Sequence, residues 1–132
     1  MPLSEVDHAA AIRAYLDTAL AGATQQWHAY DYDDVPDILP TIYAVISVTR
    51  RFADDFRFSY ARNLVGYRLT TLAVGTTVDS TRWVRDRISA ALTDTPLDLN
   101  GQPTTPVRFE LENPIAWDDG RYSGMTTWIY AL

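Results

Sequence analysis

The chain of 132 residues has the length of one domain, and with 47% hydrophobic and 21% charged residues its composition is typical of a folded globular protein. Its formal net charge of −6 disfavours generic binding to nucleic-acid phosphates, and the absence of cysteine excludes disulfides and thiolate metal sites. Since no apolar run reaches the length of a membrane span and the first residues lack the pattern of a signal peptide, we predict one domain, 1–132, with no membrane contact.

The first residues of the chain predict an amphipathic helix over about 4–21. Ser4 is the expected N-terminal cap, and Asp7 stands three residues later, where a capping box places its acidic partner. Apolar side chains recur from Val6 onward at spacings of three and four, as expected for a helix that packs on a sheet. This assignment leaves His8 on the exposed flank of the helix.

Three strands are predicted before the middle of the chain. Residues 25–30 form a short strand, and 41–49 form the strongest one, which is apolar on one face and partly apolar on the other. A strand of that kind belongs near the centre of a sheet. Residues 65–74 form the third strand, so we interpret 41–74 as a long β-hairpin whose tip, near 53–55, projects beyond the sheet.

A second helix is predicted to begin at a cap, Asp79, and to bury a stripe formed by Val84, Ile88 and Leu92. The segment 93–106 contains prolines and an Asn-Gly pair, which end a helix and favour turns. We therefore expect this segment to be a connection.

The last part of the chain predicts two more strands. Apolar and charged residues alternate over 107–112, and the segment 115–132 is a hairpin that turns at 118–120, ending in a long strand. The resulting order is α-β-β-β-α-β-β. Because most neighbouring strands are joined as hairpins, we predict an α+β fold with two helices packed on a mainly antiparallel or mixed sheet.

The segment 28–40 is the one that most looks like a site, because it is rich in carboxylates. Its aspartates are Asp31, Asp33, Asp34 and Asp37. Their spacing is similar to the start of a calcium loop, but Pro36 stands where such a loop needs glycine and its twelfth position lacks glutamate. We therefore predict a solvated acidic loop that binds no metal.

Catalytic motifs are not found. The two histidines, His8 and His28, lie in no recognisable motif, and the scattered glycines form no phosphate-binding loop. We predict no catalytic residue, no cofactor and no enzymatic activity. The alternative is a small ligand-binding or enzymatic domain with an aromatic-lined pocket between sheet and helices, although core packing is the commoner fate of such side chains. The candidate lining residues are Trp27, Tyr43, Trp117 and Trp128.

The predicted long hairpin carries a mixture of arginine and aromatic residues that suits contact with a partner. The candidate contact residues are Arg50, Arg51, Phe52, Phe56, Arg57, Phe58 and Tyr60. Such residues are enriched in protein–protein interfaces, and they can also stack on single-stranded bases. A hairpin folded back on its own domain is the third interpretation. Asp54 and Asp55 at the tip disfavour nucleic acid, so we favour protein contact.

The run AYDYDDVPDILPTIYAVISVTRR over 29–51 resembles the tail terminator and related tail-completion proteins of long-tailed phages. The similarity lies in a strand ending at Tyr30-Asp31, a loop with Val35-Pro36, and a strand led by Pro40. The long hairpin, a helix after the Gly-Thr-Thr turn at 75–77 and the C-terminal strand are also similar. One departure is that Tyr43 follows Pro40 by three residues instead of standing directly beside it.

The resemblance implies a structural protein of the virion tail or neck, present in the host cytoplasm during assembly. Proteins of this family form a ring, commonly hexameric, that ends the head-proximal side of the tail tube and joins the tail to the head. The implied partners are further copies of the chain, the tail tube protein and a head-side connector or stopper protein. Genomic DNA would pass through the ring without specific binding, and the acidic loop would face the lumen or a neighbour. Another neck protein of similar fold is the closest alternative.

Overall fold

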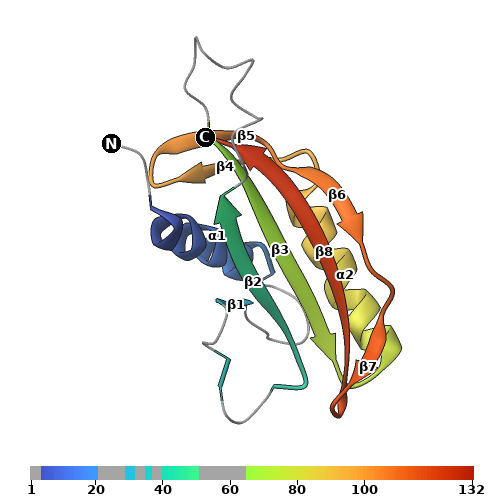
Figure 1. The fold of residues 1–132 in the computed structure, drawn as a ribbon. Coiled ribbons are helices and arrows are strands. Elements are labelled where there is room, and N and C mark those ends of the chain that lie inside the picture. Colours follow the sequence, from blue (N-terminus) through green and yellow to red (C-terminus); the bar gives the residue numbers. More distant parts are fainter. Residues whose placement is uncertain (1–3, 21–28, 32–34, 37–39, 51–64) are drawn as a thin grey trace.

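The computed structural model describes residues 4–20, 29–31, 35–36, 40–50 and 65–132 of the chain. In Figure 1 a twisted sheet forms one layer, and the two helices contact the same side of it. Helices and strands are segregated and most strand pairs are antiparallel, so the predicted α+β class is confirmed.

The elements follow the predicted order, with additional strands after the second helix. In chain order they are α1 (Glu5–Leu20), β1 (Ala29–Asp31), β2 (Ile42–Arg50), β3 (Gly66–Gly75), α2 (Val78–Leu92), β4 (Pro96–Leu99), β5 (Gln102–Pro106), β6 (Arg108–Glu112), β7 (Ala116–Asp118) and β8 (Arg121–Ala131). Over the described ranges the main sheet has the order β1-β2-β3-β8-β6, and β7 also pairs with β8. The β1–β2 pair is parallel and the other pairs are antiparallel, which makes the sheet mixed.

Helix α1 begins with the capping box that the sequence predicts. Ser4 Oγ accepts a hydrogen bond from the Asp7 N–H at 3.2 Å, and the Ser4 N–H donates to Asp7 Oδ2 at 3.2 Å. The buried side of the helix carries Ile12 and Leu16, both fully buried, whereas Val6 is 76% exposed. The apolar stripe therefore begins after Val6 and not at it.

Strands β2 and β3 form the antiparallel pair predicted for the two sides of the long hairpin. Their register runs from Ile42 opposite Gly75 to Arg50 opposite Tyr67. On β2 the alternate apolar residues face the helices, and Tyr43 on the opposite face is also buried. Burial on both faces is the property expected of a central strand, and β2 lies between β1 and β3.

Helix α2 begins at Val78 and is capped by Thr77, so the prediction of Asp79 as the cap is wrong. Thr77 has extended backbone geometry, its Oγ1 accepts from the Ser80 N–H at 3.1 Å, and its own N–H donates to Ser80 Oγ at 3.1 Å. Asp79 lies in the first turn, where its charge favours the helix dipole. A Cβ on Gly75 would lie 2.6 Å from Ser80 Oγ, so this helix start packs on β3 only because residue 75 is glycine.

The segment 93–106 is more ordered than the sequence predicts. It contains the two-stranded sheet β4–β5, which turns at Asn100 and Gly101, both with positive φ. Leu97 and Leu99 are buried in the core. The prolines of this segment favour a connection, but a short hairpin outside the main sheet tolerates proline, and the alternation of buried leucines stabilises it.

The C-terminal strands confirm the predicted hairpin and correct the strand before it. The β7–β8 turn lies at Asp119 and Gly120, with φ of 47° and 89°, which suits a tight hairpin turn. A register shift between Phe109 and Leu111 interrupts the alternation predicted for β6, and all of β6 is exposed. The bulge and the edge position leave both faces of this strand open to solvent.

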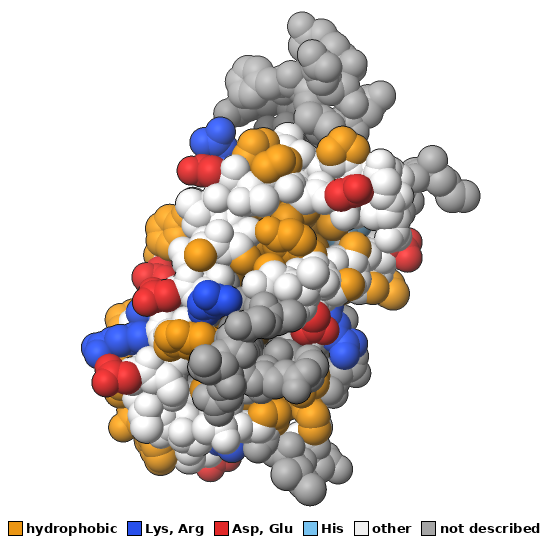
Figure 2. Space-filling model, turned by 180° about the vertical axis from the view of Figure 1, so that it is seen from behind, with side chains coloured by type: hydrophobic (Ala, Val, Ile, Leu, Met, Phe, Trp, Pro, Cys, Tyr) orange, Lys and Arg blue, Asp and Glu red, His pale blue; other side chains and the backbone are white. Residues whose placement is uncertain are grey.

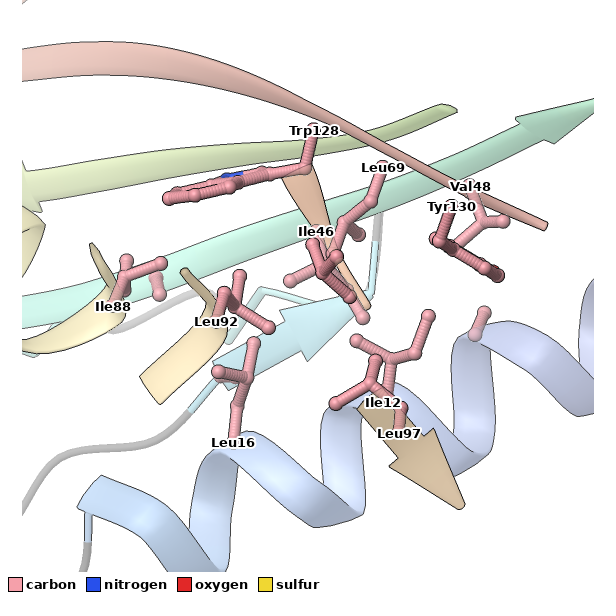
Figure 3. Close-up of a cluster of buried hydrophobic side chains, with 14 of the residues drawn as sticks. Ile12, Leu16, Ile46, Val48, Leu69, Ile88, Leu92, Leu97, Trp128 and Tyr130 are labelled. Carbon is pink, nitrogen blue, oxygen red and sulfur yellow. The ribbon is translucent and has the colours of Figure 1, made fainter. Parts of the chain in front are cut away.

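The hydrophobic core lies between the sheet and the two helices, and β4 covers one end of it. Figure 3 shows side chains from each of these elements pointing toward one another. They include Ile12 and Leu16 of α1, Ile46 of β2, Leu69 of β3, Ile88 and Leu92 of α2, Leu97 of β4, and Trp128 of β8. Core packing therefore holds in place the ends of β2 and β3 that the predicted contact segment, 51–64, joins in the chain.

Candidate functional site

The candidate site lies at the end of the sheet where β2 ends and β3 begins (Figure 1). Arg50, the last residue of β2, is exposed and stands opposite Tyr67 of β3. Next to them, Val65 and Leu132 exchange two backbone hydrogen bonds of 3.1 Å, which places the C-terminal residue beside the start of β3. Residues 51–64 connect the two strands at this end.

The structure places one of the predicted contact residues, Arg50, at this end of the sheet. The others lie outside the described residues: Arg51, Phe52, Phe56, Arg57, Phe58 and Tyr60. The predicted hairpin tip, 53–55, also lies outside them. The strand pair that leads to this segment is confirmed, and the contact surface on it stays a prediction.

A buried histidine lies against the same end of the sheet. The side chain of His8 is fully buried, and its Nδ1 is 2.7 Å from the hydroxyl oxygen of Tyr130. The imidazole stacks on the ring of Tyr67 at a centroid distance of 4.1 Å, and the two tyrosine rings stack on each other at 5.5 Å. The other ring nitrogen, Nε2, is buried and has no hydrogen-bond partner in the described part of the chain.

Burial dominates the electrostatics of this cluster. It lowers the pKa of His8 below its ordinary value, and the nearby Arg50 lowers it further, whereas Asp7 and Glu5 act in the opposite direction. Burial also raises the pKa of Tyr130 far above its ordinary value, with a smaller contribution from Tyr67. Near neutral pH, His8 is therefore an uncharged imidazole bonded to an un-ionised phenol.

The prediction that His8 lies on the exposed flank of α1 is wrong. The buried stripe runs through His8, Ile12 and Leu16 at spacings of four residues, whereas the sequence reading began the stripe at the exposed Val6. The spacing of four is visible in the sequence, but histidine is polar, so a pattern of apolar residues does not include it. His28 lies outside the described residues.

The acidic loop is described only at its edges. Asp31 ends β1, whose backbone pairs with β2, while Asp33, Asp34 and Asp37 lie outside the described residues. Among the residues that the structure describes, no group of three or more histidines and carboxylates could hold a metal ion. The prediction that this loop is a solvated connection remains a prediction.

Side chains of other elements fix the backbone on both sides of the acidic loop. The carbonyl of Ala29 in β1 accepts from Arg13 Nε at 3.1 Å, and its N–H donates to Asp17 Oδ1 at 2.8 Å. On the far side, Arg121 Nη1 donates to the carbonyl of Pro40 at 2.5 Å. Helix α1 and strand β8 therefore fix the direction in which the chain enters and leaves the loop.

The three described aromatic residues among the candidates for a pocket lining do not converge. Trp128 is 1% exposed in the core, where its Nε1 donates to Thr71 Oγ1 at 3.1 Å. Tyr43 is buried on the face of the sheet away from the helices, and Trp117 is 60% exposed on β7. Trp27 lies outside the described residues. For Trp128 the core-packing interpretation is confirmed.

An exposed apolar edge on β6 and β7 was not predicted from the sequence. It consists of Phe109, Leu111 and Trp117, exposed by 54%, 55% and 60%. The bulge in β6 and a bidentate ion pair between Arg68 and Glu110, at 2.8 and 2.9 Å, interrupt this edge. Bulges and charges of this kind oppose the addition of another strand. A contact at this edge would therefore use its side chains more than its backbone hydrogen-bonding groups.

One face of the described surface shows no broad basic region. Figure 2 shows the face opposite to that of Figure 1, where arginines and carboxylates are scattered among hydrophobic and uncharged groups. Three arginines form ion pairs with carboxylates: Arg68 with Glu110, Arg82 with Asp79, and Arg85 with Glu112. Neither described helix has the length and apolar character needed to cross a membrane.

Comparison with known proteins supports the fold alone. No family model matches the sequence, and no curated protein matches it. A solved structure whose name states no function aligns with a TM-score of 0.69 and 12% sequence identity, covering 98% of this chain and 96% of that chain. At this identity the likeness shows the fold alone, and it extends over nearly the whole of both chains.

Proposed function

We propose that this chain is a structural protein of the tail-terminator type, which forms a ring at the head-proximal end of a long phage tail. The ring stops growth of the tail tube and joins the tail to the head. The observation that carries the proposal is the β2–β3 pair, which is continuous to Arg50 and Tyr67 and brings the arginine-rich and aromatic segment 51–64 to one end of the sheet.

A closed ring needs an interface between two different patches of neighbouring protomers. Aromatic and arginine side chains are the residues that most often dominate such interfaces. Residues 51–64 hold several of them between two strands that the core fixes in place, and Arg50 is exposed at the end of β2. Long connections in compact domains are commonly functional, which supports giving this segment the contact role.

The charge distribution supports passage of DNA without tight binding. The chain has a net charge of −6, and Arg68, Arg82 and Arg85 are each paired with a carboxylate. Weak repulsion of phosphates suits a ring through which genomic DNA passes.

The proposed partners are the tail tube protein on one side of the ring and a head-side connector or stopper protein on the other. This assignment gives the chain a place in the virion tail or neck, and in the host cytoplasm before assembly. A terminator would arrest growth of tubes by purified tail tube protein, whereas a protein of another neck layer would leave tube growth unchanged. That assay distinguishes a tail terminator from a protein of another neck layer.

Phe56→Ser and Phe58→Ser should each impair ring assembly while leaving the fold intact, because each removes an aromatic contact from the proposed interface. Size-exclusion chromatography with light scattering gives the mass of the assembly, and circular dichroism reports the fold. The matched control is Phe109→Ser, which removes a 54% exposed phenylalanine from β6.

If both variants assembled as the unchanged chain does, residues 56 and 58 would not belong to the contact. If Phe109→Ser alone prevented assembly, the contact would lie on the β6–β7 edge.

A further inference from the structure

We propose that His8 makes the packing of helix α1 sensitive to pH, such that one proton on its imidazole releases the N-terminal half of α1 from the sheet. The proposal rests on the cluster of His8, Tyr67 and Tyr130, which joins α1 to β3 and β8. It does not depend on the ring proposed above.

Among the described residues, the cluster has no acceptor for the second N–H of a protonated His8 ring. Protonation turns both imidazole nitrogens into N–H donors. The hydroxyl of Tyr130, 2.7 Å from Nδ1, can accept from one of them. The other nitrogen, Nε2, is buried with no partner among the described residues, so in the charged ring it is an unpaired donor. Burying such a group is costly, and the cost is relieved when His8 reaches water.

The charged groups around His8 do not stabilise the proton enough to keep α1 packed. On its own helix, Asp7 and Glu5 attract the proton, but Asp7 also accepts a 2.9 Å hydrogen bond from the Ser4 hydroxyl. On β2, Arg50 repels the proton. On β3 and β8 the imidazole is faced by the rings of Tyr67 and Tyr130. Burial outweighs the two carboxylates, and the folded pKa of His8 lies below its ordinary value of 6.5.

The direction of the pH effect follows from this order of pKa values. With α1 open, His8 titrates near its ordinary value, so the open form binds more protons than the packed form in the window below it. Packing is therefore at full strength above the ordinary pKa and weakens as the pH falls toward the lower, folded pKa. For a single proton, the opening constant rises by up to about tenfold per pH unit within that window.

Release of α1 would alter the end of the sheet that holds the candidate site. His8 covers the rings of Tyr67 and Tyr130, and Tyr67 stands opposite Arg50 at the end of β2. Opening the first half of α1 would expose these rings to water. The remaining elements, including α2, pack on β3 and β8 through other side chains and should stay folded.

Amide hydrogen exchange of the full chain, followed by NMR, tests the proposal with α2 as an internal reference. After correction for intrinsic exchange rates, protection of the α1 amides relative to α2 should fall between about pH 7.5 and about pH 5, by up to about tenfold per pH unit within the window below the ordinary pKa of His8. In His8→Phe, which keeps an aromatic ring on Tyr67, this difference should disappear. The matched control is His28→Phe at the other histidine of the chain, and it should behave as the unchanged protein.

Unchanged relative protection of α1 between the two pH values, or a pH effect that persists in His8→Phe, would overturn the proposal. If His8→Phe does not fold, the ring protons of His8 in the unchanged protein provide the second readout. Their titration must follow the opening of α1 with pH. An opening midpoint near the ordinary range of carboxylates, about pH 4, with His8 titrating elsewhere, would also overturn it.

Discussion

Ile46→Asp should abolish folding. Ile46 is fully buried in β2, the strand between β1 and β3, and its side chain points into the cluster between the sheet and the helices (Figure 3). An aspartate there would bury a carboxylate with no partner and remove an apolar side chain from the core. Each effect costs several kcal/mol, and together they approach the total stability of about 5–15 kcal/mol that is typical of a domain.

Circular dichroism and thermal denaturation measure this effect. The matched control is Thr49→Asp, which places the same residue at an exposed position of the same strand and should shift the melting temperature only slightly. Equal melting temperatures for Ile46→Asp and the unchanged chain would show that β2 does not occupy the centre of the core.

Trp128→Ala should destabilise the fold by about 3–5 kcal/mol, the usual range for truncating a buried tryptophan. Trp128 is 1% exposed, it fills the space between the sheet and α2, and its Nε1 bonds to Thr71 Oγ1. The substitution leaves a cavity and deprives the buried threonine hydroxyl of its donor.

Urea denaturation gives the free energy of unfolding for this variant. Trp117→Ala is the control, because Trp117 is 60% exposed on β7 and its loss should cost less than about 1 kcal/mol. Similar losses in the two variants would contradict the assignment of Trp128 to the core and of Trp117 to the surface.

The secondary structure of long periodic segments was predictable because the local residue pattern determines it. The capping box at Ser4, the strand pair 42–50 with 66–75, and the stripe of α2 follow from residue spacing and cap chemistry. Short elements were not predictable in the same way. The β4–β5 hairpin contains prolines that usually indicate a connection, and it is stabilised by burial of Leu97 and Leu99 against the rest of the core.

The candidate site was predictable only in part, because its geometry is tertiary. The sequence indicated where a contact segment begins, at Arg50, but not that His8 stacks on Tyr67, the residue opposite Arg50. His8 and Tyr130 are 122 residues apart, and no local pattern brings them together. The exposed edge of β6 depends on a bulge that shifts the register after Phe109, and a simple alternation of apolar residues does not reveal such a shift.

The mass and shape of the assembly test the proposed ring most directly. Light scattering during size-exclusion chromatography, with negative-stain imaging, should be carried out on the chain alone and in the presence of tail tube protein. We expect a closed ring with a central opening and a mass near six times the 14.9 kDa of one chain, either alone or at the ends of tubes. A strictly monomeric mass at high concentration, together with tube ends that carry no additional ring, would contradict the proposal.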